Sequence, residues 1–419
     1  MASTDKIPTS LFLLPTPPSP IDSHSIHAAY SQPLEKVLDD LSTLTTKASC
    51  TTVLDIAVKV PSLDDFDHIP RAFVYEELQS LLSHLYKLFC TLCVRKSINT
   101  IGPRSVDVRI ILIQSALDPS QENDEIENSH RSRFGPIVDL PVLLLSGRVW
   151  QQIYAVESES GEALLQTFLQ TERALLRRNS NFRRVPGGIS MTCSTKSQET
   201  AESKHPSNIR RHFSVAVGGT FDHLHIGHKL LLTCTALLLE PEIMQKPTPQ
   251  RLMTIGITGD ELLKNKKYAA LVESWSDRQK AVMKFLDAIL DFRPSDSKFN
   301  DERRISEPEP NGKRLLTKMG RETLIDCVEI SDPFGPTITD ETISALVVSA
   351  ETRSGGKAVN DKRTEKGWPT LEVFEVDVLD AEEADEKTRF SANDNFQSKI
   401  SSTEIRRQLA EKQIASKTE

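Results

Sequence analysis

The sequence predicts two successive α/β domains, of which the second is built on a doubly wound parallel sheet. At roughly 150 residues per domain, a chain of 419 residues has room for two or three compact units. Short runs that are apolar throughout alternate with helical patterns, which is typical of parallel strands buried between helices. Near the middle of the chain a stretch rich in Ser, Thr, Gly and Pro interrupts this alternation.

The first domain is expected over residues 1–184. Strand-like runs ("TTVLDIAVKV", "VDVRIILIQ", "DLPVLLLS") alternate there with helical patterns ("YEELQSLLSHLYKLFCTLCV", "GEALLQTFLQTERALLRR"). Cys90 and Cys93 form a CxxC pair within the first helical pattern. No second pair completes a zinc site, so we interpret them as core thiols. Nothing in this half is a signature of chemistry, and we expect a degenerate module for regulation or assembly.

We expect an interdomain linker over residues 185–210. The second domain is expected over residues 211–412. After the linker, strand and helix patterns alternate again from "HFSVAVGG" to the last helix through "EIRRQLAEK". The stretch at 293–321 is rich in charge, Pro and Gly, and we expect a flexible insertion there.

Composition narrows the class of protein. A net charge of -8 with 38% hydrophobic and 26% charged residues describes an ordinary soluble chain and argues against general nucleic-acid binding. The only N-terminal apolar run is short and followed by prolines, which predicts neither a membrane span nor a secretory signal. The six cysteines lack the density of a disulfide scaffold. We therefore expect a cytoplasmic protein.

The stretch "GGTFDHLHIGHK", residues 218–229, carries the strongest chemical signal. It follows the first strand of the second domain and precedes a helix expected to begin near Ile226 or Gly227. Adjacent glycines permit close backbone approach, and a helix N-terminus offers free N–H groups, which together suit a phosphate. His225 and His228 are three apart rather than four, which disfavours zinc. A plain turn with exposed histidines is the remaining alternative.

This stretch resembles the His-x-Gly-His signature of the nucleotidyltransferase superfamily, in particular the pantetheine-phosphate adenylyltransferase domain of eukaryotic coenzyme A synthases. The resemblance extends from Phe213 to about Lys412 and implies a Rossmann-like nucleotidyltransferase fold. Four later stretches agree with that family in the same order: "TGDELLKNKK", "DPFGPTITD", "LVVSAETRSGGKAVN" and "KISSTEIRR".

The resemblance implies a role for each residue of the first stretch. His228 would contact the α-phosphate of ATP at the transition state, Thr220 would help hold the reacting phosphates, and His225 would bind nucleotide phosphate beside Gly218 and Gly219. Adenylyl transfer needs positioning and charge neutralisation rather than a side-chain nucleophile. A helix N-terminus with an imidazole donor meets that need.

Two lysines are candidates for the remaining phosphate contacts. In "LLKNKK" the resemblance implies one lysine that reaches the attacking phosphate or the α-phosphate; we assign Lys264 as catalytic and Lys267 as substrate-binding. Clustered lysines are also typical of a solvated face, and this alternative stays open.

The last stretch, "ISSTEIRR", supplies hydroxyls and a cation at a helix start. By resemblance Ser401, Ser402 and Thr403 would bind the β- and γ-phosphates of ATP, with Arg406 as a fixed cation. A serine-rich helix start is by itself also consistent with a plain N-cap.

The stretch "LVVSAETRSGGKAVN" differs from the related bacterial short form of the enzyme. In that form arginines after this strand bind ATP, whereas this sequence has Ser349 and Thr352 in those places. Arg353, Lys357 and Arg363 are available cations nearby, and each is equally consistent with an ordinary surface charge.

The expected reaction is transfer of the adenylyl group of ATP to 4'-phosphopantetheine, giving dephospho-coenzyme A and pyrophosphate. Mg²⁺ would accompany ATP, and no protein residue is assigned as a metal ligand. "RSGGKAVN" lacks the spacing of a kinase P-loop, so we expect a monofunctional enzyme with a separate dephospho-coenzyme A kinase, and a complex with other coenzyme A biosynthesis enzymes. Two alternatives remain: another nucleotidyltransferase, for cytidylyl transfer or for a mononucleotide acceptor, and a non-catalytic regulatory scaffold.

Overall fold

The computed structural model shows a chain folded as two compact units. The first is Met1–Arg210 with two short later segments, 243–245 and 289–297, and the second is the remainder from Arg211. Each is described by itself. The structure describes residues 7–60, 63, 69–114, 133–178, 180–189, 209–241, 249–294, 298, 300–305, 313–320, 323–377, 379, 396 and 400–418.

The first unit is built on a six-stranded sheet in which every pair is parallel, in the order β4-β3-β2-β1-β5-β6. Its central strands are buried along their length, as expected for a sheet covered on both faces. The strands are β1 (Thr9–Leu14), β2 (Thr52–Lys59), β3 (Val106–Ile113), β4 (Ile137–Val138), β5 (Gln152–Glu157) and β6 (Phe182–Pro186).

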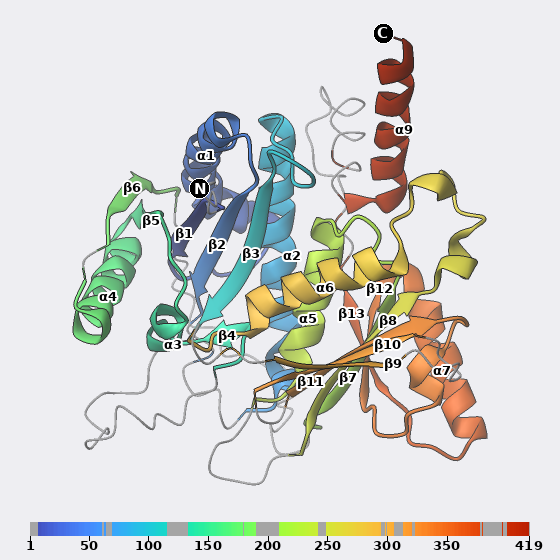
Figure 1. The fold of residues 1–419 in the computed structure, drawn as a ribbon. Helices are drawn as coiled ribbons and strands as arrows, with labels where there is room; N and C mark the ends of the chain where they lie inside the picture. The colour runs from blue at the N-terminus through green and yellow to red at the C-terminus, as the bar shows by residue number, and fades with distance from the viewer. Residues whose placement is uncertain are drawn as a thin grey trace. The chain divides into compact units, whose positions relative to one another are not determined.

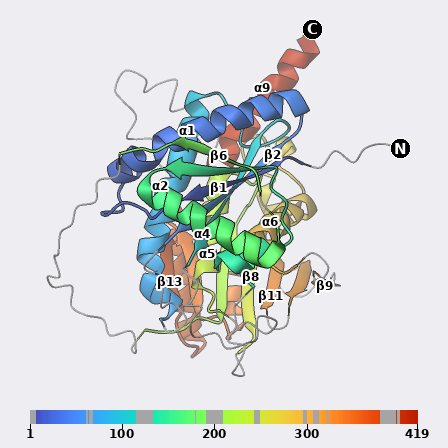
Figure 2. The ribbon, with the colours of Figure 1, turned by 90° about the vertical axis from the view of Figure 1, so that its left-hand side faces the viewer.

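Helices cover both faces of this sheet. They are α1 (Ser23–Ala48), α2 (Arg71–Arg95), α3 (Leu140–Leu145) and α4 (Glu159–Leu176). Helices α1 and α2 pack together, as do α3 and α4, and Figure 2 shows α4 in front of β1. Cys90 and Cys93 are buried in α2, as a core position requires.

One predicted strand of this unit is a helix. "DLPVLLLS" forms α3, because Asp139 caps the helix by accepting a hydrogen bond from the backbone N–H of Val142 at 2.8 Å. Pro141 stands in the first turn, where its missing N–H costs nothing. An apolar run this short has no periodicity that separates strand from helix, so the capping residues decided.

The second unit holds a seven-stranded sheet in the order β13-β12-β7-β8-β11-β10-β9 (Figure 1). The five strands from β13 to β11 are parallel. The strands are β7 (Ser214–Gly219), β8 (Arg251–Thr258), β9 (Asn300–Ile305), β10 (Arg314–Met319), β11 (Thr323–Ile330), β12 (Ala345–Ser349) and β13 (Glu372–Val376).

The strand order of this sheet reverses at β7, which has β8 on one side and β12 on the other. Sheets of this kind bind ligands outside the carboxyl ends of the strands at such a reversal. The helices are α5 (Ile226–Leu238), α6 (Trp275–Leu290), α7 (Arg353–Glu365) and α9 (Ser402–Thr418). Val359 of α7 packs with Ala216 and Leu346 on one face, and right-handed crossovers put α5 on the other.

The prediction of a flexible insertion over 293–321 is wrong for most of its described residues. Strand β10 pairs antiparallel with both β11 and β9, so the segment extends the sheet by two strands. Apolar Leu315 and Met319 of β10 are buried while β9 is exposed. This single-sided burial explains why the sequence shows so little hydrophobic pattern.

The predicted fold class is confirmed: a doubly wound sheet with a parallel core follows a second α/β unit. Of the predicted linker 185–210, Val185 and Pro186 belong to β6, and 190–208 lies outside the described residues. The prediction also passed over β1, α1, β4, β5, β6 and α7. No described helix has the length and apolar character that crossing a membrane requires.

Candidate active site

The stretch of residues 218–229 runs from the end of β7 into α5. Gly218 is exposed, and a Cβ built on it would meet no atom within 4 Å, so the backbone can be approached closely there. Thr220 follows at the carboxyl edge of the sheet, where the Thr258 hydroxyl donates to the Gly219 carbonyl at 3.2 Å. The helix begins at Ile226, as the sequence predicted.

His225 and His228 form a stacked pair at the start of α5. His225 is the N-cap, and its Nδ1 accepts a long hydrogen bond, 3.4 Å, from the backbone N–H of His228. The two rings lie 3.7 Å apart between centroids with an interplanar angle of 19°. A Cβ on Gly227 would lie only 3.3 Å from the His225 ring, so the glycine makes room for the pair.

Both imidazoles are electrically neutral at physiological pH. Burial, and to a lesser extent the proximity of His223, lowers the pKa of His228 to about 3. Burial, with smaller contributions from His228, His223 and Lys229, lowers the pKa of His225 well below its usual range. His228 keeps some exposed surface, but its Nδ1 is buried without a hydrogen-bond partner among the described residues. A neutral ring still donates one N–H, so the pair can hydrogen-bond a phosphate oxygen.

Asp222 anchors the loop between β7 and α5 through hydrogen bonds to distant residues. Its side chain is fully buried, and the carboxylate accepts from the backbone N–H of Glu273 at 2.9 Å and from Arg406 at 2.5 Å. A carboxylate this buried requires such partners. The loop therefore depends on residues some 50 and 180 positions away in the chain.

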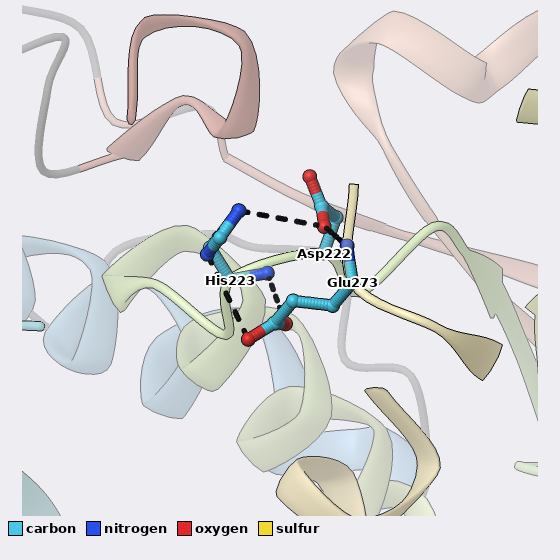
Figure 3. Close-up of side chains that lie close together, drawn as sticks. All are labelled: Asp222, His223 and Glu273. Atoms are coloured by element: carbon cyan, nitrogen blue, oxygen red, sulfur yellow. Dashed lines mark hydrogen bonds and ion pairs between the residues drawn. The ribbon is translucent and has the colours of Figure 1, made fainter. Parts of the chain in front are cut away.

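His223, which has no predicted role, holds the same loop to residues before α6. Its backbone N–H donates to the Glu273 carboxylate at 2.7 Å, and its ring Nε2 bonds to the Leu271 carbonyl at 2.9 Å. Figure 3 shows Asp222, His223 and Glu273 gathered in this way. The φ of His223 is 47°, a left-handed conformation that these bonds maintain.

These three side chains also have the geometry of a metal site, since one ligand atom from each lies within 4.8 Å of the others. Their hydrogen bonds account for the arrangement without an ion. Both Asp222 oxygens and one Glu273 oxygen already accept from backbone N–H groups or Arg406. We therefore assign no metal ligand here.

The start of α9 meets the start of α5. The Ser402 hydroxyl donates to the Asp222 carbonyl at 2.9 Å, and the Ile400 carbonyl lies 3.6 Å from the Cβ position of Gly227. Ser401, Ser402 and Thr403 are thus brought close to the histidine pair, although they are some 180 residues away in sequence.

Arg406, in the first turns of α9, is buried and donates hydrogen bonds to three other residues. Besides Asp222 it donates to the Lys267 carbonyl at 3.1 Å and to the Thr403 hydroxyl at 3.2 Å. These bonds tie together the histidine loop, the lysine loop and α9. Contact with a nucleotide, predicted for Arg406, would use the N–H groups that remain.

The two predicted lysines lie on the loop that follows β8. Both side chains are exposed, and the Lys264 ammonium pairs with the Glu261 carboxylate three residues earlier. Lys267 is linked to the site through its carbonyl, which Arg406 binds. Arg406 links this loop to the histidine loop, but both lysine ammonium groups lie on exposed side chains.

Arg278, like Asp222 and Glu273, is a residue of this site that the sequence prediction missed. Its guanidinium is fully buried and bonds to the carbonyls of Thr220 and Thr258, at the ends of β7 and β8. A signal was present: Arg278 stands on the same helical stripe as the buried Val282 and Phe285, where a charged residue is unexpected.

The cations after β12 are engaged elsewhere. Arg353 forms a two-bond pair with Glu375, and Arg363 is fully buried with five hydrogen bonds to carbonyls. Ser349 and Thr352 bond to each other in a capping box at the start of the following helical segment. These contacts favour the structural alternative for each residue.

Comparison with known proteins gives one family model and several similar proteins. A family model described as a domain of unknown function (DUF8446) matches residues 1–191. The chain is 38% identical over 196 residues to a Schizosaccharomyces pombe protein named Uncharacterized protein C1F12.08, covering 46% of this chain and 48% of that protein. It is 35% identical over 208 residues to a Saccharomyces cerevisiae protein named phosphopantetheine adenylyltransferase, covering 50% of this chain and 52% of the yeast protein.

Shorter relatives carry the same name. A Pyrococcus horikoshii phosphopantetheine adenylyltransferase is 28% identical over 171 residues, which are 41% of this chain and 82% of the archaeal protein. A solved structure, the protein with unknown function from Archaeoglobus fulgidus, aligns at 25% identity with a TM-score of 0.26 over 39% of this chain and 98% of its own. The chain spans about half the length of the two fungal relatives. The relatives named phosphopantetheine adenylyltransferase confirm the predicted resemblance to that family.

Proposed function

We propose that this chain transfers the adenylyl group of ATP to 4'-phosphopantetheine, forming dephospho-coenzyme A and pyrophosphate. The observation that carries the proposal is the meeting of two helix starts at the carboxyl edge of the second sheet. The start of α5 supplies His225 and His228, the loop before it supplies Thr220, and the start of α9 supplies the hydroxyls of residues 401–403. The names of the yeast and archaeal relatives supply the acceptor.

The chemistry fits this arrangement of donors. Attack of the acceptor phosphate oxygen on the α-phosphorus forms one P–O bond while the bond to pyrophosphate breaks, so no covalent enzyme intermediate is needed. Negative charge grows on the transferred phosphate, and helix N–H groups with a neutral imidazole donor stabilise it. In this proposal His228 binds the α-phosphate, and Lys264 and Lys267 approach the phosphates when these are bound.

Mg²⁺ enters this proposal as part of the substrate, because ATP is normally handled as its magnesium complex. Its ligands would be phosphate oxygens and water. The proposal also includes a cytoplasmic location and a separate dephospho-coenzyme A kinase that acts on the product, in a complex with other enzymes of coenzyme A biosynthesis.

The decisive experiment is pyrophosphate release by the purified full chain. ATP and CTP are each combined with 4'-phosphopantetheine, phosphocholine and nicotinamide mononucleotide. Release only with ATP and 4'-phosphopantetheine supports the proposal. Release with another pair assigns a different nucleotidyltransferase, and release with none leaves the scaffold alternative.

A further inference from the structure

Arg278 of α6 binds four acceptors from three separate segments. Nη1 donates to the Thr220 carbonyl at 2.6 Å, and Nη2 donates to the Thr258 carbonyl and the Asp260 carboxylate, both at 2.7 Å. Nε donates to the Glu273 carbonyl at 3.0 Å. The side chain has no exposed surface. Its bonds run to backbone and to one partly exposed carboxylate, so it does not itself reach solvent or ligand.

The segments that Arg278 joins lead to the two loops that would bind the two substrates of the proposed reaction. Thr220 begins the loop that leads to His225 and His228, where the nucleotide would bind. Thr258 ends β8 and leads into the loop that carries Lys264. Arg278 therefore joins the start of the nucleotide loop, residues 219–228, to the start of the acceptor loop, residues 259–268, while Arg406 joins the same two loops further along, at Asp222 and Lys267.

Packing alone does not explain an arginine at this position. The neighbouring positions of the same stripe, Val282 and Phe285, are apolar and buried. A guanidinium there must be desolvated at substantial cost, which only a full set of hydrogen bonds offsets. Lysine cannot replace it, because a single ammonium group lacks the planar fork that reaches several fixed acceptors at once.

We propose that Arg278 is a positioning residue that aligns the acceptor phosphate with the α-phosphate of ATP. The inference rests on the proposed function. By fixing the ends of β7 and β8 together it places the attacking oxygen in line with the departing pyrophosphate, without touching either substrate. Such alignment lowers the barrier of a reaction that has little other chemistry for the protein to perform.

The test compares Arg278→Lys with Arg363→Lys in the full chain. Arg363 is the matched control: it is equally buried and donates five hydrogen bonds to backbone carbonyls, but these belong to residues 337–343 and 369. In Arg278→Lys, kcat falls by about 100-fold, while the Kd of each substrate, measured separately, changes by less than about threefold. In Arg363→Lys, kcat per folded molecule stays within about threefold of the wild type.

Two outcomes overturn the inference. One is a folded Arg278→Lys variant with wild-type kcat, and the other is a loss of rate fully accounted for by weaker binding of one substrate. Hydrogen exchange gives a second readout that needs no activity. Exchange in the nucleotide and acceptor loops must rise together in Arg278→Lys and not in Arg363→Lys; a uniform rise across the unit contradicts positioning. Absence of pyrophosphate release by the wild type would instead refute the proposed function.

Discussion

His228 combines two properties that suit transition-state binding. It lies at a helix N-terminus beside a second imidazole, and its buried Nδ1 has no hydrogen-bond partner among the described residues. A buried polar atom without a partner costs free energy in the folded state, which a bound phosphate can recover.

His228→Ala is expected to lower kcat by about two to three orders of magnitude, the usual loss for one transition-state donor. His228→Asn keeps a side-chain N–H and should retain more activity than the alanine variant. Steady-state pyrophosphate release measures both. Turnover at the wild-type rate in His228→Ala would remove this residue from the mechanism.

The buried histidines also make the unfolding free energy depend on pH. The pKa of His228 is about 3 in the folded state against an ordinary value of 6.5, so between these values the unfolded chain binds more protons. Stability therefore falls as pH decreases below 6.5, with a limiting slope of about 1.4 kcal/mol per pH unit for this group. Above that range the group contributes no pH dependence.

Urea unfolding at pH 7 and pH 5 measures this effect. His228→Asn should lose less stability than the wild type between the two values, because it removes one buried imidazole. His27→Asn, on the exposed side of α1, is the control. Equal pH dependence in wild type and His228→Asn would show that His228 is not held neutral by burial.

At the scale of elements, the start of α5 depends on the absence of a side chain at position 227. A Cβ there would lie 3.3 Å from the His225 ring and 3.6 Å from the Ile400 carbonyl of the segment entering α9. The glycine thus lets the histidine pair and the second helix start approach each other.

Gly227→Ala should weaken ATP binding several-fold and give none of the stability that alanine usually adds to a helix, roughly 0.5–1 kcal/mol. Gly355→Ala in α7 is the matched control, because a Cβ there meets nothing within 4 Å. That variant should be slightly more stable with unchanged ATP affinity. Isothermal titration and thermal unfolding test both, and a stabilised Gly227→Ala variant with full ATP affinity would contradict the close approach.

Elements with strong local signals were predicted correctly, and those with weak ones were not. Long apolar runs identified β2, β3, β7 and β8, whose burial on both faces leaves a clear pattern. Strands β9 and β10 are polar because only one of them is partly buried, and α3 was decided by an N-cap and a proline. Hydrophobic pattern alone could not distinguish β9 and β10 from a loop, or α3 from a strand.

At the scale of the whole chain, the two units differ in the charge of the side chains at their helix N-termini. The strand order of the first unit also reverses, between β1 and β5, where such sheets bind ligands. There Asp22 and Ser158 cap the following helices, and Glu159 and Glu162 stand in the first turn of α4. Negative side chains at a helix start disfavour an anion, in contrast to the start of α5. A regulatory or assembly role for the first unit remains our hypothesis.

The sequence by itself determined the fold class, the strand-to-helix position of the histidine stretch and the set of residue types that a phosphate site needs, because these depend on local pattern and on short spacings. Tertiary structure decided which of those residues are held together and how. Arg278, Asp222 and Arg406 act through partners far away in the chain, and the neutrality of the histidines comes from burial. Neither long-range hydrogen bonding nor desolvation leaves a local mark on the sequence beyond a charged residue in an apolar stripe.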